Sequence, residues 1–187
     1  MSWSQIAAAD VQPQRWKNAG GWTRELLAWP HASDWLLRIS VADIEQDGPF
    51  SAFDGVQRWI AVLQGPGIRL YEYELFPGDE PLSFDGALAP DCSLIDGPTR
   101  DFNLMHRRGH GRLELLTAAQ PLPAGPADWL ALFSAEGGTL RHGCRAMRLA
   151  PQSLAWCEQP AEQPLQFEGQ GAAWWLRWCR TDVEARP

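Results

Sequence analysis

The spacing of apolar residues leaves almost no room for helix in this chain of 187 residues. A helix that packs on a core repeats its apolar residues about every 3.6 positions, and only Ser4–Ala9 and Thr181–Arg186 offer a turn or two of that kind. Short runs of aromatic and branched residues are instead separated by glycine, proline and aspartate, which is typical of strands joined by turns. The predicted strands are residues 23–28, 35–41, 59–63, 68–75, 102–106, 113–117, 129–133, 146–149 and 173–179. The predicted fold class is all-β.

The chain also repeats itself. Trp59–Leu63 resembles Trp129–Phe133, and each is followed by a glycine-containing turn and a further strand. Pro81–Gly86 resembles Pro164–Gly169, at an offset of 83 residues instead of 70. Because repeated order indicates a duplicated unit, we expect two antiparallel jelly-roll barrels.

The two halves are predicted to span residues 1–100 and 101–187, with turn residues at Asp96–Pro98 marking the boundary. A chain of this length can hold one substantial core or two small β units, and we expect the halves to pack as one compact unit. The 11 tryptophans either fill the two cores or form the surface patch of a protein-interaction module.

The net charge of −7 gives no basic field to attract a phosphate backbone, so we expect no nucleic-acid partner. The first residues do not resemble a signal peptide, and no run approaches the roughly 20 apolar residues of a membrane helix. The cysteines have neither CxxC nor zinc-like spacing. We therefore expect a cytoplasmic protein, without membrane association, whose free thiols are buried, at Cys92, Cys144, Cys157 and Cys179.

Trp16–Glu25 is the least ordinary run of the chain, and it contains the only lysine. Its adjacent glycines, Gly20 and Gly21, permit positive φ or close approach of the backbone to a ligand. Around them the run places an ammonium, an amide, a hydroxyl and a guanidinium, on Lys17, Asn18, Thr23 and Arg24. A genome that favours arginine explains the rarity of lysine, so the argument for Lys17 depends on its setting and not on its rarity.

Two later segments alternate in the manner of strands. In the first, Arg38 and Ser40 share one face while Leu37 and Ile39 share the other. The polar face either meets water or lines a cavity, where an arginine fork would suit a carboxylate. In the second, one polar face is either a ligand-binding surface or a solvated edge strand, and it carries Asp101, Asn103, Met105 and Arg107.

Other patterns are weaker. The loop Gly48–Gly55 suits either a lid or a rigid turn held by its phenylalanines. His106 and His110 have the HxxxH spacing of a helical metal site, but in a context of strand and glycine. Neither His31 nor His142 adds a cluster of two histidines and a carboxylate, so no metal and no cofactor is predicted. Nucleophile-elbow, phosphate-loop and dinucleotide motifs are absent from the sequence.

Four segments together resemble the HutD/Ves family, over about residues 10 to 110: Trp16–Glu25, Arg38–Ala42, Gly48–Phe53 and Asp101–Arg108. The resemblance implies a bacterial protein with a cupin-type fold of two β-barrel units (a bicupin), without the usual cupin metal histidines. It also implies a link to histidine catabolism, in which family members are proposed to bind N-formylglutamate or urocanate. One departure is Ala19, which stands where the family commonly has the first of three glycines and where positive φ would strain alanine.

Three functions remain open. The first is a metal-free sensor or scavenger whose first barrel binds a small anionic metabolite through the ten residues named on these segments: Lys17, Asn18, Thr23, Arg24, Arg38, Ser40, Asp101, Asn103, Met105 and Arg107. The second is an isomerase or hydrolase in the same pocket, with Lys17 as acid or base and Asp101 as its complement. The third is the interaction module. The oligomeric state is open, with a homodimer as one alternative.

Overall fold

The computed structural model describes residues 2–160 and 164–181, and contacts divide the chain into two units. The central unit consists of residues 11–108, and the terminal unit combines residues up to 10 with those from 109 onward. This division differs from the predicted one, between residues 100 and 101. Strand β11 (Thr99–Arg107) runs through that position without a break and pairs on both sides within the central unit.

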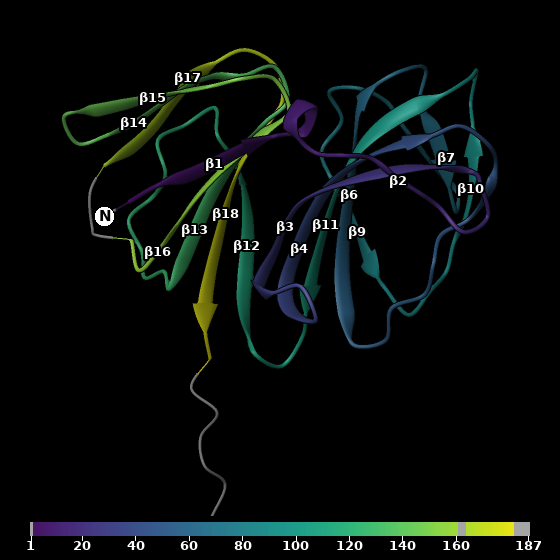
Figure 1. Ribbon diagram of the computed structural model, residues 1–187, viewed down its shortest axis with the longest axis horizontal. Coiled ribbons are helices and arrows are strands. Elements are labelled where there is room, and N and C mark those ends of the chain that lie inside the picture. The colour runs from purple at the N-terminus through teal and green to yellow at the C-terminus, as the bar shows by residue number, and fades with distance from the viewer. Residues whose placement is uncertain (1, 161–163, 182–187) are drawn as a thin grey trace, which may run out of the picture. The chain divides into compact units, whose positions relative to one another are not determined.

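The central unit contains two antiparallel sheets (Figure 1). The larger has the order β2 (Gln14–Arg15), β3 (Gly21–His31), β4 (Asp34–Ile44), β11, β6 (Val56–Gln64) and β9 (Leu82–Asp85). The smaller has the order β5 (Gly48–Pro49), β10 (Asp91–Leu94), β7 (Ile68–Leu70) and β8 (Tyr73–Leu75). One core joins them, because Ile60 and Val62 of the larger sheet belong to the same buried cluster as Ile68 and Leu70 of the smaller.

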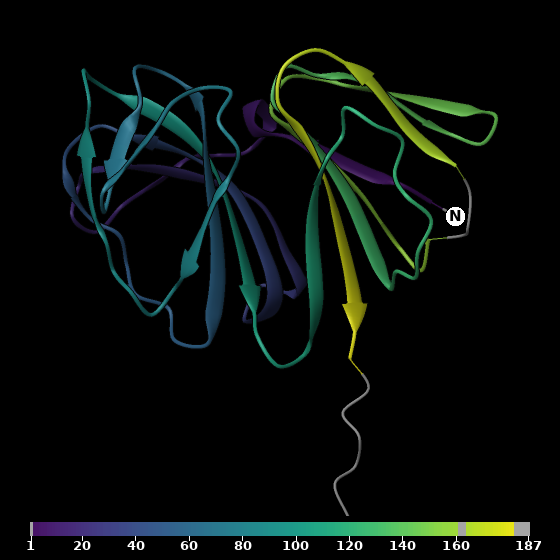
Figure 2. The same cartoon turned by 180° about the vertical axis from the view of Figure 1, so that it is seen from behind.

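The terminal unit also contains two antiparallel sheets, seen from the other side in Figure 2. The larger has the order β1 (Ser4–Ala7), β16 (Ser153–Glu158), β13 (Trp129–Ser134), β18 (Ala173–Arg180) and β12 (Gly111–Thr117). The smaller has the order β15 (Arg145–Leu149), β14 (Gly138–His142) and β17 (Leu165–Gly169). Leu132 and Trp175 of the larger sheet share a buried cluster with Leu140 and Leu165 of the smaller.

The strand order repeats between the units. The run β9-β6-β11-β4 matches β16-β13-β18-β12, and β10-β7-β8 matches β17-β14-β15. The echo between Trp59–Leu63 and Trp129–Phe133 therefore joins equivalent strands. The echo between Pro81–Gly86 and Pro164–Gly169 does not, because β9 pairs with β6 in a larger sheet while β17 pairs with β14 in a smaller one.

The all-β prediction is confirmed, since the described residues form strands and one short 3-10 helix, Ala8–Asp10. The predicted helical turn at Ser4–Ala9 is wrong for its first residues, which pair with β16 as strand β1. The second predicted turn falls on residues 182–186, outside the described part of the chain. No helix within the described residues is long and apolar enough to cross a membrane.

Trp175 belongs to the buried core cluster of the terminal unit, and Trp129 and Trp178 are also fully buried. No tryptophan occurs among the exposed large hydrophobic residues of the described chain, so the surface-patch interpretation finds no support. The cysteines are free, but only two of them are buried as predicted. Cys144 is exposed and Cys179 is partly exposed, because each lies near a strand end.

Candidate ligand-binding site

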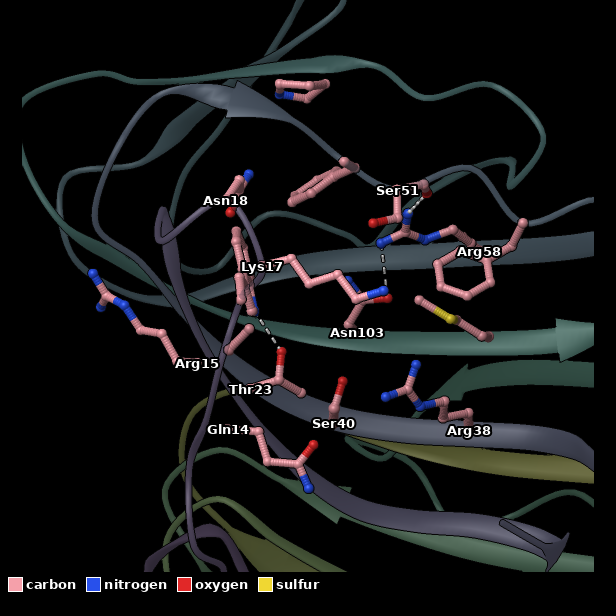
Figure 3. Close-up of a pocket in the computed structure, with 16 residues that line it drawn as sticks. Gln14, Arg15, Lys17, Asn18, Thr23, Arg38, Ser40, Ser51, Arg58 and Asn103 are labelled. Atoms are coloured by element: carbon pink, nitrogen blue, oxygen red, sulfur yellow. Dashed lines mark hydrogen bonds between the residues drawn. The ribbon is translucent and has the colours of Figure 1, made fainter. Parts of the chain in front are cut away.

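A cavity of about 610 Å³ opens on the larger sheet of the central unit. Its walls come from β2, the turn that follows it, β3, β4, β6, β11 and the segment after β5 (Figure 3). Seven of the ten predicted site residues line it: Lys17, Asn18, Thr23, Arg38, Ser40, Asn103 and Met105. Residues 80 positions apart in the sequence, such as Thr23 and Asn103, therefore meet at one cavity.

Strand pairing creates the polar floor of this cavity. β11 lies between β4 and β6, with Ser40 opposite Asn103 and Arg38 opposite Met105. The interpretation of residues 100–109 as a solvated edge strand is therefore wrong. Arg38 points into the cavity, while Leu37 on the other face of β4 is fully buried.

The turn that carries Lys17 depends on two unusual backbone positions. Ala19 adopts a φ of 59°, so the strain expected at this alanine is present. Gly21 does not use positive φ; a Cβ built there would lie 2.2 Å from the backbone oxygen of Asp43, so only glycine permits this approach. The Asn18 carboxamide oxygen accepts a hydrogen bond of 3.0 Å from the Gly20 amide, which fixes the turn beside the cavity.

Lys17 is exposed at the rim and extends over the cavity toward Asn103, between Arg58 and Arg38 (Figure 3). It forms no ion pair with any described carboxylate. Arg38 differs, because its Nε donates to Glu25 Oε2 at 2.5 Å. The amine of Lys17 is thus the more available charge for an incoming anion.

Arg58 is the main residue that the sequence analysis missed. Its side chain is only 3% exposed, and it lines the cavity beneath three phenylalanine rings, of which Phe50 and Phe84 lie 5.0 and 5.1 Å from the guanidinium carbon. Its terminal nitrogens donate to the Ser51 carbonyl at 3.2 Å and to Asn103 Oδ1 at 3.3 Å, both neutral acceptors. Burial lowers the pKa of Arg58 to about 10, which still leaves it charged near neutrality.

A sequence signal for Arg58 did exist. It shares the core-facing parity of β6 with Ile60 and Val62, both of which are buried. An arginine on the apolar face of a strand needs hydrogen-bond partners or a ligand. The loop before it supplies some of these groups: Ser51 accepts from Arg58, and Phe50 both lines the cavity and belongs to the core, so this segment is a wall of the site.

Asp101 lies behind the cavity floor and does not line it. It shares the face of Asn103 on β11, stands opposite the cavity residue Ala42, and is fully buried. Neither carboxylate oxygen makes a hydrogen bond of ordinary geometry. Burial raises the pKa of Asp101 to about 7, although the charge of Arg58 and the nearby backbone of Ala42 oppose the change.

The other two predicted residues lie outside the cavity. Arg24 is on the opposite face of β3, where its Nη1 contacts Asp43 Oδ2 at 2.5 Å. Arg107 shares the correct face of β11 but lies beyond the cavity, paired with Asp34 at 2.6 Å and stacked on Trp35. Charge and parity alone did not reveal that these arginines have nearer partners.

The structure offers little for a metal ion. Within the described residues, no group of three histidine, cysteine, aspartate or glutamate side chains is placed to hold one. His106 is buried in β11, whereas His110 is exposed in the turn that follows, so the two residues do not share a helical face.

The family model described as HutD matches residues 8–175. The chain belongs to the HutD family. An uncharacterized 21.2 kDa protein in the hutC 3′ region of Pseudomonas putida is 37% identical over 145 residues, which cover 72% of this chain and 75% of that protein. Protein Ves of Cronobacter sakazakii is 28% identical over 162 residues, 83% of this chain and 88% of the relative.

Solved structures agree with this assignment. HutD from Pseudomonas fluorescens SBW25, in a formate condition, has a TM-score of 0.79 at 27% identity and covers 96% of this chain and 100% of that one. A cupin 2 conserved barrel domain protein from Leptotrichia buccalis has a TM-score of 0.53 at 14% identity over 92% of this chain and 94% of that one. The second likeness concerns the fold alone, and it supports the cupin-like class.

Proposed function

We propose that this HutD-family protein is a metal-free binding protein that senses or sequesters a small anionic intermediate of histidine catabolism, such as N-formylglutamate or urocanate. The observation that carries the proposal is the convergence of Lys17 and Arg58 on one cavity without a described carboxylate bound to either. In a protein of net charge −7, two such cations in one hollow favour an anionic ligand.

The cavity has the size and chemistry that such a ligand needs. Its volume of about 610 Å³ lies within the range of small-molecule sites. Hydroxyl and amide groups of Ser40, Thr23 and Asn103 can direct hydrogen bonds, while Phe50 and Met105 provide apolar contact. A carboxylate that enters loses its hydration and regains charge-assisted hydrogen bonds, each worth about 1.5–3 kcal/mol.

The family context supports the class of ligand. The Pseudomonas putida relative is named for its place in the hutC 3′ region, and the similar Pseudomonas fluorescens structure is named HutD. Both names fit the link to histidine catabolism that the sequence resemblance implies.

The geometry supports binding more than catalysis. The enzymatic hypothesis pairs Lys17 with Asp101 as acid and base, but Lys17 is exposed at the rim and Asp101 is buried behind the floor. The two groups are not assembled around one reacting atom. Following N-formylglutamate and urocanate by NMR in the presence of the protein tests this alternative directly, and turnover that Lys17→Ala abolishes would favour it.

Isothermal titration calorimetry with N-formylglutamate and with urocanate tests the binding proposal. We expect Lys17→Met to weaken binding by about 5- to 30-fold, since it removes one charge-assisted contact at an exposed position. Arg69→Gln is the matched control, because it removes one positive charge from the exposed ion pair with Glu74, outside the cavity. Absence of binding at millimolar ligand, or equal affinities for wild type and Lys17→Met, would refute the proposal.

A further inference from the structure

Asp101 presents a problem that the proposed function does not solve. A fully buried carboxylate with no hydrogen bond of ordinary geometry, stabilised only by the nearby backbone of Ala42 and the charge of Arg58, is costly, and a neutral side chain would cost less in its place. Its position connects it to the cavity. Along β11 it precedes the floor residue Asn103 on the same face, and its cross-strand neighbours are the lining residue Ala42 and the core residue Val62.

Arg58 links the two environments. Its guanidinium lines the cavity and donates to Asn103 Oδ1, while its charge is the strongest described influence that stabilises ionised Asp101. No ion pair joins the two side chains among the described residues, so the attraction acts at longer range than a salt bridge. A ligand carboxylate that reaches Arg58 would be a second negative charge near this guanidinium, and it would repel ionised Asp101.

The remaining charged and titratable groups around Asp101 do not relieve this competition. Asp43 on β4 adds negative potential, although Arg24 and Arg100 pair with it. Cys92 on β10 stays protonated, because burial, with help from the charge of Asp101, raises the pKa of its thiol to about 12. Arg58 on β6 is therefore the one cation among these neighbours that the ligand and Asp101 must share.

We propose that the site binds an anion and a proton together. The positive charge of Arg58 stabilises the ligand carboxylate in place of ionised Asp101, and Asp101 takes up a proton from solvent to become a neutral carboxylic acid. No bond is made or broken other than this O–H bond. The inference rests on the proposed function and specifies how the site responds to pH, since an ionised Asp101 opposes the ligand and a protonated one does not.

The site supports a defined pH dependence. With the pKa of Asp101 near 7 in the free protein and higher in the complex, affinity is constant in mild acid and falls as pH rises. The limiting slope is about tenfold in Kd per pH unit, which corresponds to one proton bound with the ligand. Asp101→Asn cannot ionise, so it should bind with an affinity that does not change over the same range.

Calorimetric titration with N-formylglutamate between about pH 6 and about pH 8.5 tests this, because its carboxylates do not titrate there. Repeating each titration in buffers of different ionisation enthalpy counts the protons taken up. We expect uptake of about half to three quarters of a proton near pH 7.5 by wild type and none by Asp101→Asn. Asp91→Asn, a change of an exposed aspartate outside the cavity, should keep the wild-type slope.

The outcomes separate the two proposals. Binding by wild type with neither pH dependence nor proton uptake would overturn the coupling and leave the binding function intact. The same slope in Asp101→Asn as in wild type would assign the proton to another group and also overturn it. Absence of binding at every pH would overturn the proposed function and the coupling together.

Discussion

Replacing the buried Asp101 by asparagine should stabilise the protein, and increasingly so as pH rises. The folded-state pKa of about 7 exceeds the unfolded value of 3.8 by roughly 3 units, and each unit corresponds to about 1.4 kcal/mol. Because the folded pKa is raised, the folded state binds more protons. The contribution of this group to stability is therefore complete below about pH 4 and is lost as pH rises to about 7.

The total loss is about 4 kcal/mol, of which between 2 and 3 kcal/mol falls between pH 5 and pH 8. Asparagine has nearly the same shape and no charge, so it avoids this loss. Urea unfolding of wild type and Asp101→Asn at several pH values measures the difference, with Asp91→Asn as an exposed control. If the difference between wild type and Asp101→Asn does not grow from pH 5 to pH 8, then Asp101 is not a carboxylate deprived of partners and the reasoning fails.

Three further changes probe the cavity and its turn. Gly21→Ala should lower the unfolding free energy, measured in urea, by about 1–3 kcal/mol, because its Cβ would lie 2.2 Å from a backbone oxygen. Gly48→Ala, whose Cβ would have no atom nearer than 3.7 Å, should cost much less, and equal costs for the two variants would contradict this argument. Ala19→Gly should raise the unfolding free energy by at most about 1 kcal/mol, because glycine relieves the strain of a φ of 59° but increases the entropy of the unfolded chain. A clear loss of stability would show that the strain is absent. Glu25→Gln should lower the Kd for N-formylglutamate, measured by calorimetry, by about fivefold, because it removes the 2.5 Å ion pair of Arg38 and leaves that arginine free to bind the anion. An unchanged Kd would exclude Arg38 from the anion site.

The sequence predicted the class of fold and much of its local structure, because strand periodicity and turn residues act over short distances. The sequence could not predict which distant strands pair at the edges of the sheets. Ser4–Ala7 pairs with Ser153–Glu158, about 150 residues away, and the apolar pattern of neither segment identifies the other as its partner. Short strands such as Gly48–Pro49 carry no periodicity at all, so they emerge only from tertiary pairing.

Strand parity predicted which candidate residues share a face, but it could not predict which of them have other partners. Alternation left open whether Arg38 meets water or lines a cavity, and the structure places it with Asn103 at one cavity. Alternation also suggested Arg107, but a salt bridge to Asp34, 73 residues away, holds that side chain elsewhere. Arg58 was missed because the predicted strand, residues 59–63, began one residue after it, whereas β6 begins at Val56.

The duplicated fold shows that the cavity belongs to particular side chains and not to the architecture. In matching strands, Asp101 stands opposite Val62 of β6 and Trp175 stands opposite Leu132 of β13, so Trp175 occupies the position equivalent to Asp101. Trp175 is fully buried, so an indole fills the position where the central unit holds a buried carboxylate.

The same register makes Arg177 the equivalent of Asn103, and Glu114 of β12 the equivalent of Ser40 of β4. In the terminal unit these two residues form an ion pair of 2.5 Å, and Arg177 also donates to a backbone carbonyl at 2.8 Å. Its charge is therefore satisfied within the protein, whereas the central unit leaves Arg58 with neutral acceptors only. The second copy keeps the sheet order but neutralises the cation that a ligand would need, which explains why the anion site is expected in one unit alone.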